Sequence, residues 1–147
     1  MSSRVLAVDL GATSGRVIEG HVGPNRLEHV VVHRFPNGPV QDGSSLRWNV
    51  TGLFEEVIRG LRVAGESNEK VLSVGVDSWA VDYALLKGGA LLEEPRHYRD
   101  TRTEESVERV HQKADHATLF GLNGLQFLPF NSIYQLAAED WSGVAGT

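Results

Sequence analysis

Residues 5–35, VLAVDLGATSGRVIEGHVGPNRLEHVVVHRF, decide the fold of this chain. They contain three runs that carry β-branched residues, at 5–9, 16–22 and 27–35, and two short turns rich in Gly and polar residues separate these runs. Three strands joined by short turns predict an antiparallel meander. A doubly wound sheet alternates strand and helix from its first strand, so the meander argues against that architecture.

Helices and further strands are expected after the meander. Residues 36–45 are rich in Gly, Pro and polar residues and predict a loop. Apolar residues recur at helical spacing between Asn49 and Gly65 and predict a helix there. Asn49 is expected to cap its N-terminus, and Gly65 is expected to end it. Later apolar runs and capping residues predict strands at 71–77 and 83–86 and helices from Thr103 to about Ala114, from Asp115 through Phe120 and from Asn131 through Asp140. The order β-β-β-α-β-β-α describes a mixed α/β chain.

Composition narrows the classes of function. The chain has 147 residues, of which 41% are hydrophobic and 22% charged, and its net charge is −5. The length predicts one domain, and the balance of apolar and charged residues argues against disorder. No cluster of Lys or Arg forms a basic face, so a nucleic-acid partner is not expected. The absence of cysteine excludes disulfides and thiolate metal sites and fits an intracellular location.

Residues 117–138 contain no Asp, Glu, Lys or Arg and are long enough to span a membrane. Four amide side chains, two glycines and Pro129 interrupt this stretch. Polar groups are costly in hydrocarbon, so we expect a buried or ligand-facing loop and helix here, and no membrane partner.

The turn at residues 9–16 is the first candidate site. Asp9 ends an apolar strand, and a glycine turn with two hydroxyl side chains follows it. Glycines let backbone N–H groups approach an anion closely, and a carboxylate beside them suits Mg²⁺, which takes carboxylates together with phosphate oxygens. An ordinary hairpin turn of the same composition is the alternative. The P-loop is excluded because no Lys follows the glycines, and the dinucleotide motif is excluded because residues 16–22 indicate a strand.

Three later stretches hold further candidate binding residues. Residues 77–83 place carboxylates and aromatic rings just past a strand, where ligands of α/β folds bind, although a solvated strand end with Trp79 in the core would look the same. Residues 96–102 surround Tyr98 with Arg and Asp side chains, which suit either a polar substrate or a surface ion-pair network. Residues 123–131 combine amides and aromatics, as in the wall of a polyol pocket or a loop packed under a helix.

Together these stretches resemble the N-terminal part of the FGGY carbohydrate kinase family, within the superfamily of actin, hexokinase and Hsp70 ATPases. The resemblance covers nearly all of residues 4–140 and follows four segments in order, which are VDLGATSGR at 8–16, VDSWAVDY at 76–83, YRDTRT at 98–103 and QFLPFNSIYQL at 126–136. The first segment indicates the superfamily, whereas the second and fourth resemble the subgroup that phosphorylates the 1-hydroxyl of L-rhamnulose. Ala80 stands where that subgroup is expected to have Gly.

The resemblance implies an α/β fold with a ribonuclease-H-like (actin-like ATPase) mixed sheet, in which an antiparallel three-strand meander is followed by parallel strands with flanking helices. It implies a cytoplasmic kinase that uses ATP and Mg²⁺ and takes a ketose sugar as its substrate. Asp9 would help to hold Mg²⁺ through water. The phosphates of ATP would lie against Gly11, Ala12, Thr13, Ser14, Gly15 and Arg16. The sugar pocket would include Trp79, Ala80, Asp82, Tyr98 and Asp100.

Members of the family are roughly three times as long as this chain and have a second ATPase domain. Residues 1–147 are therefore expected to be the N-terminal part of the first domain, with the second domain absent. The catalytic Asp, which takes the proton of the sugar hydroxyl, is expected beyond residue 147. The chain alone is then expected to be inactive and to expose core surface through which it self-associates.

Two other interpretations remain open. The first changes only the substrate, to xylulose, fuculose or a related ketose, within the same kinase family. The second is a half-domain without catalysis that binds a sugar, a nucleotide or a partner protein.

Overall fold

The computed structural model describes residues 2–141. The chain divides into two compact units, although its length predicts one domain. The first unit comprises the residues up to 39 together with residues 49–80. The second unit comprises residues 40–48 and the residues from 81 onward.

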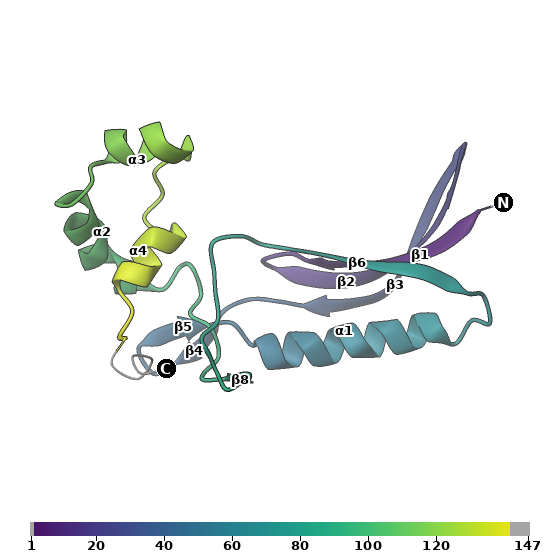
Figure 1. Ribbon diagram of the computed structural model, residues 1–147. Coiled ribbons are helices and arrows are strands. Elements are labelled where there is room, and N and C mark those ends of the chain that lie inside the picture. Colours follow the sequence, from purple (N-terminus) through teal and green to yellow (C-terminus); the bar gives the residue numbers. More distant parts are fainter. Residues whose placement is uncertain (1, 142–147) are drawn as a thin grey trace. The chain divides into compact units, whose positions relative to one another are not determined.

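A four-stranded sheet forms the body of the first unit (Figure 1). Its strands are β1 (Ser3–Leu10), β2 (Ser14–Gly23), β3 (Arg26–Pro36) and β6 (Val71–Ser78), in the order β3-β2-β1-β6. The β1–β2 and β2–β3 pairs are antiparallel, whereas β1 and β6 are parallel. The predicted meander is therefore confirmed, and of the parallel strands predicted to follow it the sheet within residues 2–141 contains one, β6.

β1 shows the alternation of a half-buried strand. Leu6 and Val8 are buried, whereas Ala7 between them is exposed. Val17 of β2 lies opposite Val8 in the register and is also fully buried. The core of the first unit is therefore built on one face of the meander.

Arg4 is a charged residue at a buried position of β1. Its guanidinium donates to the Glu19 carboxylate at 2.6 Å and to the carbonyl oxygens of Ala64 and Glu69, each also at 2.6 Å. The hydrogen bond from Arg4 holds the pKa of the Glu19 carboxyl below its ordinary value. A buried charge needs such partners, so this cluster joins β1 and β2 to the residues around the end of the helix.

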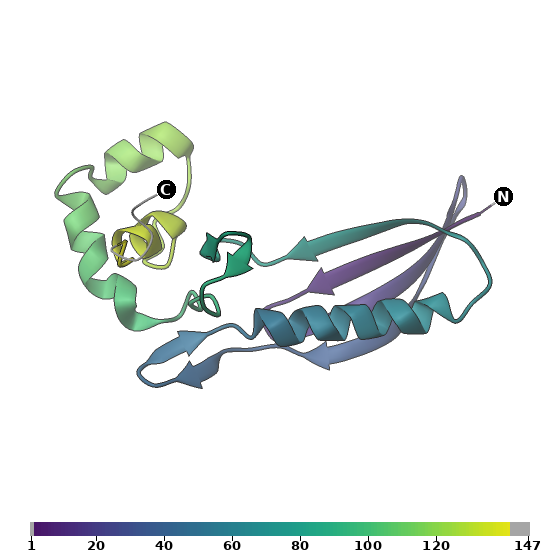
Figure 2. The ribbon, with the colours of Figure 1, turned by 60° about the horizontal axis from the view of Figure 1, so that its bottom comes forward.

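Helix α1 (Val50–Gly65) runs along the strands of the sheet and packs on β2 and β3 (Figure 2). Asn49 caps it as predicted, because its Oδ1 accepts the Gly52 N–H at 2.9 Å. A Cβ on Gly60 would lie 2.4 Å from Cγ2 of Val17. The helix therefore approaches β2 so closely at this point that only glycine fits.

The loop expected at residues 36–45 is partly wrong. β4 (Val40–Asp42) and β5 (Ser45–Arg47) form an antiparallel hairpin in the second unit, and Gly43 in its turn has a φ of 57°. The Gly and Pro residues that predict a loop belong instead to the turn and to the residues before the hairpin.

The strand predicted at residues 83–86 is also wrong over its first three residues. Only β7 (Leu86–Lys87) and β8 (Ala90–Leu91) pair there, around a turn of two glycines with positive φ. The Tyr83 side chain instead donates a hydrogen bond to Glu139, which is described below.

Four short helical segments belong to the second unit (Figure 1). They are η1 (Thr101–Thr103), α2 (Glu104–His111), α3 (His116–Asn123) and α4 (Ser132–Ala137). The three predicted helices are confirmed, but α2 ends before Ala114 and α4 ends before Asp140. None of the helices within residues 2–141 combines the length and the apolar run that crossing a bilayer requires.

The caps explain where α3 begins and ends. Asp115 accepts the Thr118 N–H at 2.8 Å, as its position before the helix predicts. Gly124 has a φ of 68° and closes the helix in the left-handed conformation, so α3 continues past the predicted end at Phe120. Asn131 precedes α4 as predicted, but its side chain makes no capping bond.

The fit of α1 against β2 predicts that Gly60→Ala lowers the free energy of unfolding by about 1–3 kcal/mol, because the added methyl group overpacks a close contact. Gly65→Ala is the matched control, since a Cβ at the end of the same helix meets no atom within 4 Å. That variant should be neutral or stabilised by up to about 1 kcal/mol. Urea unfolding measures the free energy of unfolding of both variants. Equal changes in Gly60→Ala and Gly65→Ala would contradict the close approach of α1 to β2.

Candidate functional site

The turn between β1 and β2 holds the first cluster of candidate residues. Asp9 pairs in register with Arg16, and its Oδ2 lies 3.1 Å from Arg16 Nε. The Gly11 N–H closes the turn by donating to the Ser14 carbonyl at 3.1 Å. Thr13 in this turn is exposed. The residues predicted to bind phosphate therefore lie in the β1–β2 turn and at the start of β2, where Thr13 is open to solvent.

Asp77 is a second carboxylate beside Asp9. Because β1 and β6 are parallel, Asp9 and Asp77 pair in register near the carboxyl ends of both strands, which is where ligands of α/β sheets bind. The neighbouring strands therefore offer two carboxylates at one edge of the sheet, although Oδ2 of Asp9 already lies 3.1 Å from Arg16 Nε. Carboxylate oxygens are ligands that Mg²⁺ takes together with water and phosphate. The residues present therefore fit the predicted Mg²⁺. Residues 2–141 contain no cluster of three or more metal-ligating His, Cys, Asp or Glu side chains, so water or phosphate would complete the coordination.

Two contacts that the sequence did not reveal shape this turn. Asn37, just after β3, donates from Nδ2 to the Gly11 carbonyl at 2.8 Å, and its N–H donates to the Thr13 carbonyl at 3.2 Å. Gly15 is buried, and a Cβ there would lie 2.1 Å from the ring of Phe35. Gly15 is therefore required for packing, and the segment after β3 holds the turn in place.

Asp82 joins a polar network in the second unit. Its Oδ2 accepts a hydrogen bond from the indole Nε1 of Trp48 at 2.6 Å, and its Oδ1 accepts one from Nε2 of Gln135 at 2.9 Å. Trp48 follows β5 and Gln135 lies on α4, so segments far apart in the sequence meet at this carboxylate. These two donors fix the orientation of the Asp82 side chain.

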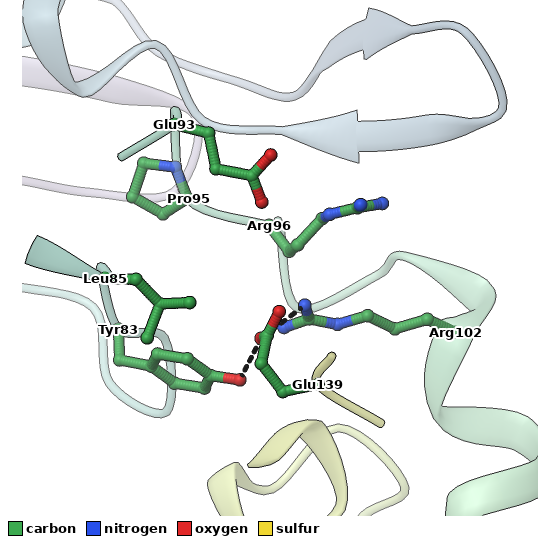
Figure 3. Close-up of a pocket in the computed structure, with 7 residues that line it drawn as sticks. All are labelled: Tyr83, Leu85, Glu93, Pro95, Arg96, Arg102 and Glu139. Carbon is green, nitrogen blue, oxygen red and sulfur yellow. Dashed lines mark hydrogen bonds and ion pairs between the residues drawn. The ribbon is translucent and has the colours of Figure 1, made fainter. Parts of the chain in front are cut away.

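Tyr83, Arg102 and Glu139 extend this network (Figure 3). The Tyr83 hydroxyl donates to Glu139 Oε2 at 2.6 Å, and Arg102 donates to the same oxygen at 3.0 Å. Burial, with the hydrogen bond to Glu139, raises the pKa of Tyr83 well above its ordinary value. Arg102 also donates to Gln135 Oε1 at 2.9 Å, which connects this group to Asp82.

A small pocket lies beside these residues (Figure 3). It is lined by Tyr83, Leu85, Glu93, Pro95, Arg96, Arg102 and Glu139. None of the residues predicted for the sugar pocket lines it. Glu139 is paired with Arg102 at 3.0 Å and Glu93 with Arg47 at 2.8 Å, so these charges already have partners. This pocket therefore does not support the predicted sugar site.

Tyr98 belongs to an aromatic cluster in the same unit. Its ring stacks on His97 with 4.5 Å between centroids and lies 5.3 Å from the ring of Phe130. The centroid of Trp48 lies 6.2 Å away. Because Trp48 also donates to Asp82, two residues of the predicted sugar pocket lie around one indole.

Asp100 has a structural role that the sequence did not indicate. It is buried, and its Oδ2 accepts the Leu46 N–H at 2.8 Å while its Oδ1 accepts the Arg102 N–H at 3.0 Å. The second bond caps η1. Both oxygens therefore bind backbone groups of the protein, and a role for Asp100 in sugar binding stays a prediction.

The predicted sugar-pocket residues are divided between the two units. Trp79 and Ala80 follow β6 in the first unit, where Trp79 is half-buried and Ala80 exposed. Asp82, Tyr98 and Asp100 lie in the second unit. Three partners of this group were not predicted from the sequence, and they are Trp48, Gln135 and Glu139. Gln135 lies within a segment that carries the family resemblance, whereas Trp48 and Glu139 lie outside those segments.

His97 is a buried histidine whose ring acts as a hydrogen-bond acceptor. It lies between Trp48 and Tyr98, and its Nδ1 accepts the Arg99 N–H at 3.0 Å. Burial lowers the pKa of His97 below its ordinary value, although the nearby Asp82 carboxylate opposes the shift. The neutral ring is therefore the form that fits the folded protein.

Comparison with known proteins identifies similar sequences. The chain is 40% identical over 136 residues to the rhamnulokinase of Ligilactobacillus salivarius and 37% identical over 135 residues to that of Bacillus subtilis. These alignments cover 92% and 91% of the chain but 28% of each relative. The chain thus spans little more than a quarter of the length of the curated relatives that it matches. No family model matches the chain.

Solved structures show the same fold. A gluconate kinase from Lactobacillus acidophilus superposes with a TM-score of 0.74 and 14% identity over 92% of this chain and 28% of that one. A xylulose kinase from the same organism gives a TM-score of 0.71 at 14% identity, with the same coverage of both chains. The predicted mixed sheet of the actin-like ATPase type and the predicted similarity to FGGY sugar kinases are therefore confirmed.

The surroundings of His97 predict a pH dependence of stability. The pKa of His97 is lower in the folded protein than in the unfolded chain. At pH values between the two pKa values, the unfolded state therefore binds more protons than the folded state. The stability that His97 contributes is present above about pH 6.5 and is lost as the pH falls through the folded pKa. Urea unfolding would measure the free energy of unfolding at about pH 7.5 and at about pH 5.5. The decrease between the two pH values should be smaller for His97→Gln than for the wild type. An equal loss in both proteins would contradict this assignment.

Proposed function

We propose that this chain is the N-terminal part of a sugar kinase that transfers the γ-phosphate of ATP to the 1-hydroxyl of L-rhamnulose. The observation that carries the proposal is the identity of 36–40% to several rhamnulokinases over 90–97% of the chain. The solved sugar kinases support the scaffold, but at 14% identity they do not support one sugar over another.

The turn at residues 9–16 is the proposed site for the phosphates of ATP. Its backbone N–H groups and hydroxyls, together with the Arg16 guanidinium, would donate to phosphate oxygens. Asp9 would hold Mg²⁺ through water, with the Asp77 carboxylate beside it in the sheet. Bound Mg²⁺ neutralises the charge that develops on the phosphoryl oxygens.

The residues proposed to bind the sugar are Trp79 and Ala80 in the first unit and Asp82, Tyr98 and Asp100 in the second. Carboxylates accept hydrogen bonds from sugar hydroxyls, and aromatic faces pack on the C–H surface of the ring. Asp82 is held in one orientation by Trp48 and Gln135, which favours recognition of one arrangement of hydroxyls. We assign the catalytic base to no residue of this chain, and we expect the chain by itself not to catalyse the transfer.

A panel of sugars tests the proposed function. The complete gene product would be assayed for ADP release with ATP, Mg²⁺ and, in turn, L-rhamnulose, L-fuculose, D-xylulose and gluconate. We expect the highest kcat/KM with L-rhamnulose. A higher value with another sugar would change the substrate, whereas no ADP release with any of them would favour a half-domain that binds without catalysis.

The proposed role of Asp9 predicts a specific loss of turnover. Asp9→Ala in the complete gene product should lower kcat by about 10²-fold or more, because charge stabilisation at the phosphates is removed, and should leave the KM for the sugar nearly unchanged. Asp42→Ala, at an exposed position on β4, is the control and should keep kcat. An unchanged kcat in Asp9→Ala would remove this residue from the site.

The exposed edge of the sheet predicts self-association of the 147-residue chain. β6 is an edge strand, and Leu72, Val74 and Val76 on one of its faces are 58%, 50% and 67% exposed. Exposed apolar rows of this kind promote association. In sedimentation experiments Val76→Lys should lower the average mass, whereas Leu122→Lys, at an exposed position on α3, should not. A monomeric wild-type chain would contradict this prediction.

A further inference from the structure

Val81 has a backbone conformation that its side chain disfavours. Its φ is 71°, in the left-handed region, and within residues 2–141 it is the only residue other than glycine with a positive φ. A β-branched residue rarely adopts this conformation, because its Cβ approaches the backbone too closely. The strain persists only where surrounding contacts hold the backbone in place.

Two side chains of α4 hold the Val81 carbonyl. Ser132 Oγ donates to it at 2.6 Å, and Gln135 Nε2 donates to it at 3.3 Å. Gln135 is 1% exposed, so water does not replace a lost partner of its amide. The strained backbone is therefore bonded to a buried amide on a helix that lies 54 residues further along the sequence.

The amide of Gln135 can face Val81 in only one way. Arg102 has donors but no acceptor, so the group that it contacts at 2.9 Å must be the Gln135 carbonyl oxygen. Glu139 holds Arg102 in this position at 3.0 Å. The Gln135 NH₂ group then points the other way, toward the Val81 carbonyl, the Asp82 carboxylate at 2.9 Å and the Phe130 carbonyl at 3.0 Å.

We infer that Gln135 is a positioning residue for sugar recognition. It holds Val81 in the left-handed conformation and orients the Asp82 carboxylate that follows. This inference rests on the proposed function, because Asp82 is a proposed ligand of the sugar. It assigns to α4 an effect on sugar affinity that acts through Asp82, and no effect on ATP affinity.

Gln135→Glu in the complete gene product tests the inference. The carboxylate keeps the bond from Arg102 but cannot donate to Val81 and brings a second negative charge to Asp82. The KM for the sugar should rise by about tenfold or more, while the KM for ATP stays within about twofold of the wild type. Gln112→Glu, at an exposed position after α2, is the matched control and should change neither constant.

The pH profile separates positioning from simple loss of structure. Protonation of the introduced carboxyl restores one donor, so the rise in the sugar KM of Gln135→Glu should shrink as the pH is lowered, relative to the wild type at each pH. A misfolded variant would not recover in acid. An unchanged sugar KM, or equal losses for sugar and ATP at every pH, would overturn the inference.

Val81→Gly tests the strained residue from the other side. Glycine adopts the left-handed conformation without a Cβ penalty, so the turn should depend less on its hydrogen bonds. Gln135→Met removes the donor to Val81 and should lower the affinity for the sugar. Adding Val81→Gly to this variant should recover part of that affinity. No recovery in the double variant would contradict the role of Gln135 in holding Val81.

A spectroscopic measurement keeps this inference separate from the proposed function. The three-bond HN–Hα coupling and the ¹³C shifts of Val81 report its φ in the isotope-labelled chain, whatever its activity. The left-handed signature should be present in the wild type and lost in Gln135→Glu. If the gene product phosphorylates no sugar, the proposed function fails, but loss of the signature still supports the positioning role and its retention in the variant overturns it.

Discussion

The pairing of β1 with strands on both of its sides is the constraint on which the first unit depends. β1 is antiparallel to β2 and parallel to β6, so Asp9 has Arg16 on one side and Asp77 on the other. A parallel pair needs a crossover connection, and α1 supplies it between β3 and β6. The close contact at Gly60 allows that helix to pack on the sheet.

A network of hydrogen bonds joins distant segments of the second unit. Trp48, Gln135, Arg102 and Glu139 form a continuous chain of donors and acceptors that passes through Asp82. Each group orients the next, because an unpaired polar atom is costly once it is buried. A left-handed Val81 is tolerated at this point because its carbonyl belongs to the same chain of bonds.

Strands and helices with a clear period were predictable from the sequence. The meander, β6, α1 and its Asn49 cap all follow from local patterns of apolar and capping residues. The β4–β5 hairpin was missed because three-residue strands leave no period to read. Residues 83–85 have the composition of a strand but pair with no strand of the described chain, and the Tyr83 hydroxyl binds the Glu139 carboxylate instead. In these places tertiary contacts outweighed local propensity.

The sequence by itself determined the type of sheet, the turn after Asp9 and the similarity to sugar kinases, because these depend on residues adjacent in the chain. Only the tertiary structure showed that Asp77 pairs beside Asp9, that Asn37 holds the turn and that Asp100 binds backbone groups. It alone placed Trp48 and Gln135 on Asp82. These contacts join residues far apart along the chain, and their hydrogen bonds form only after folding has brought the segments together and excluded water from between them.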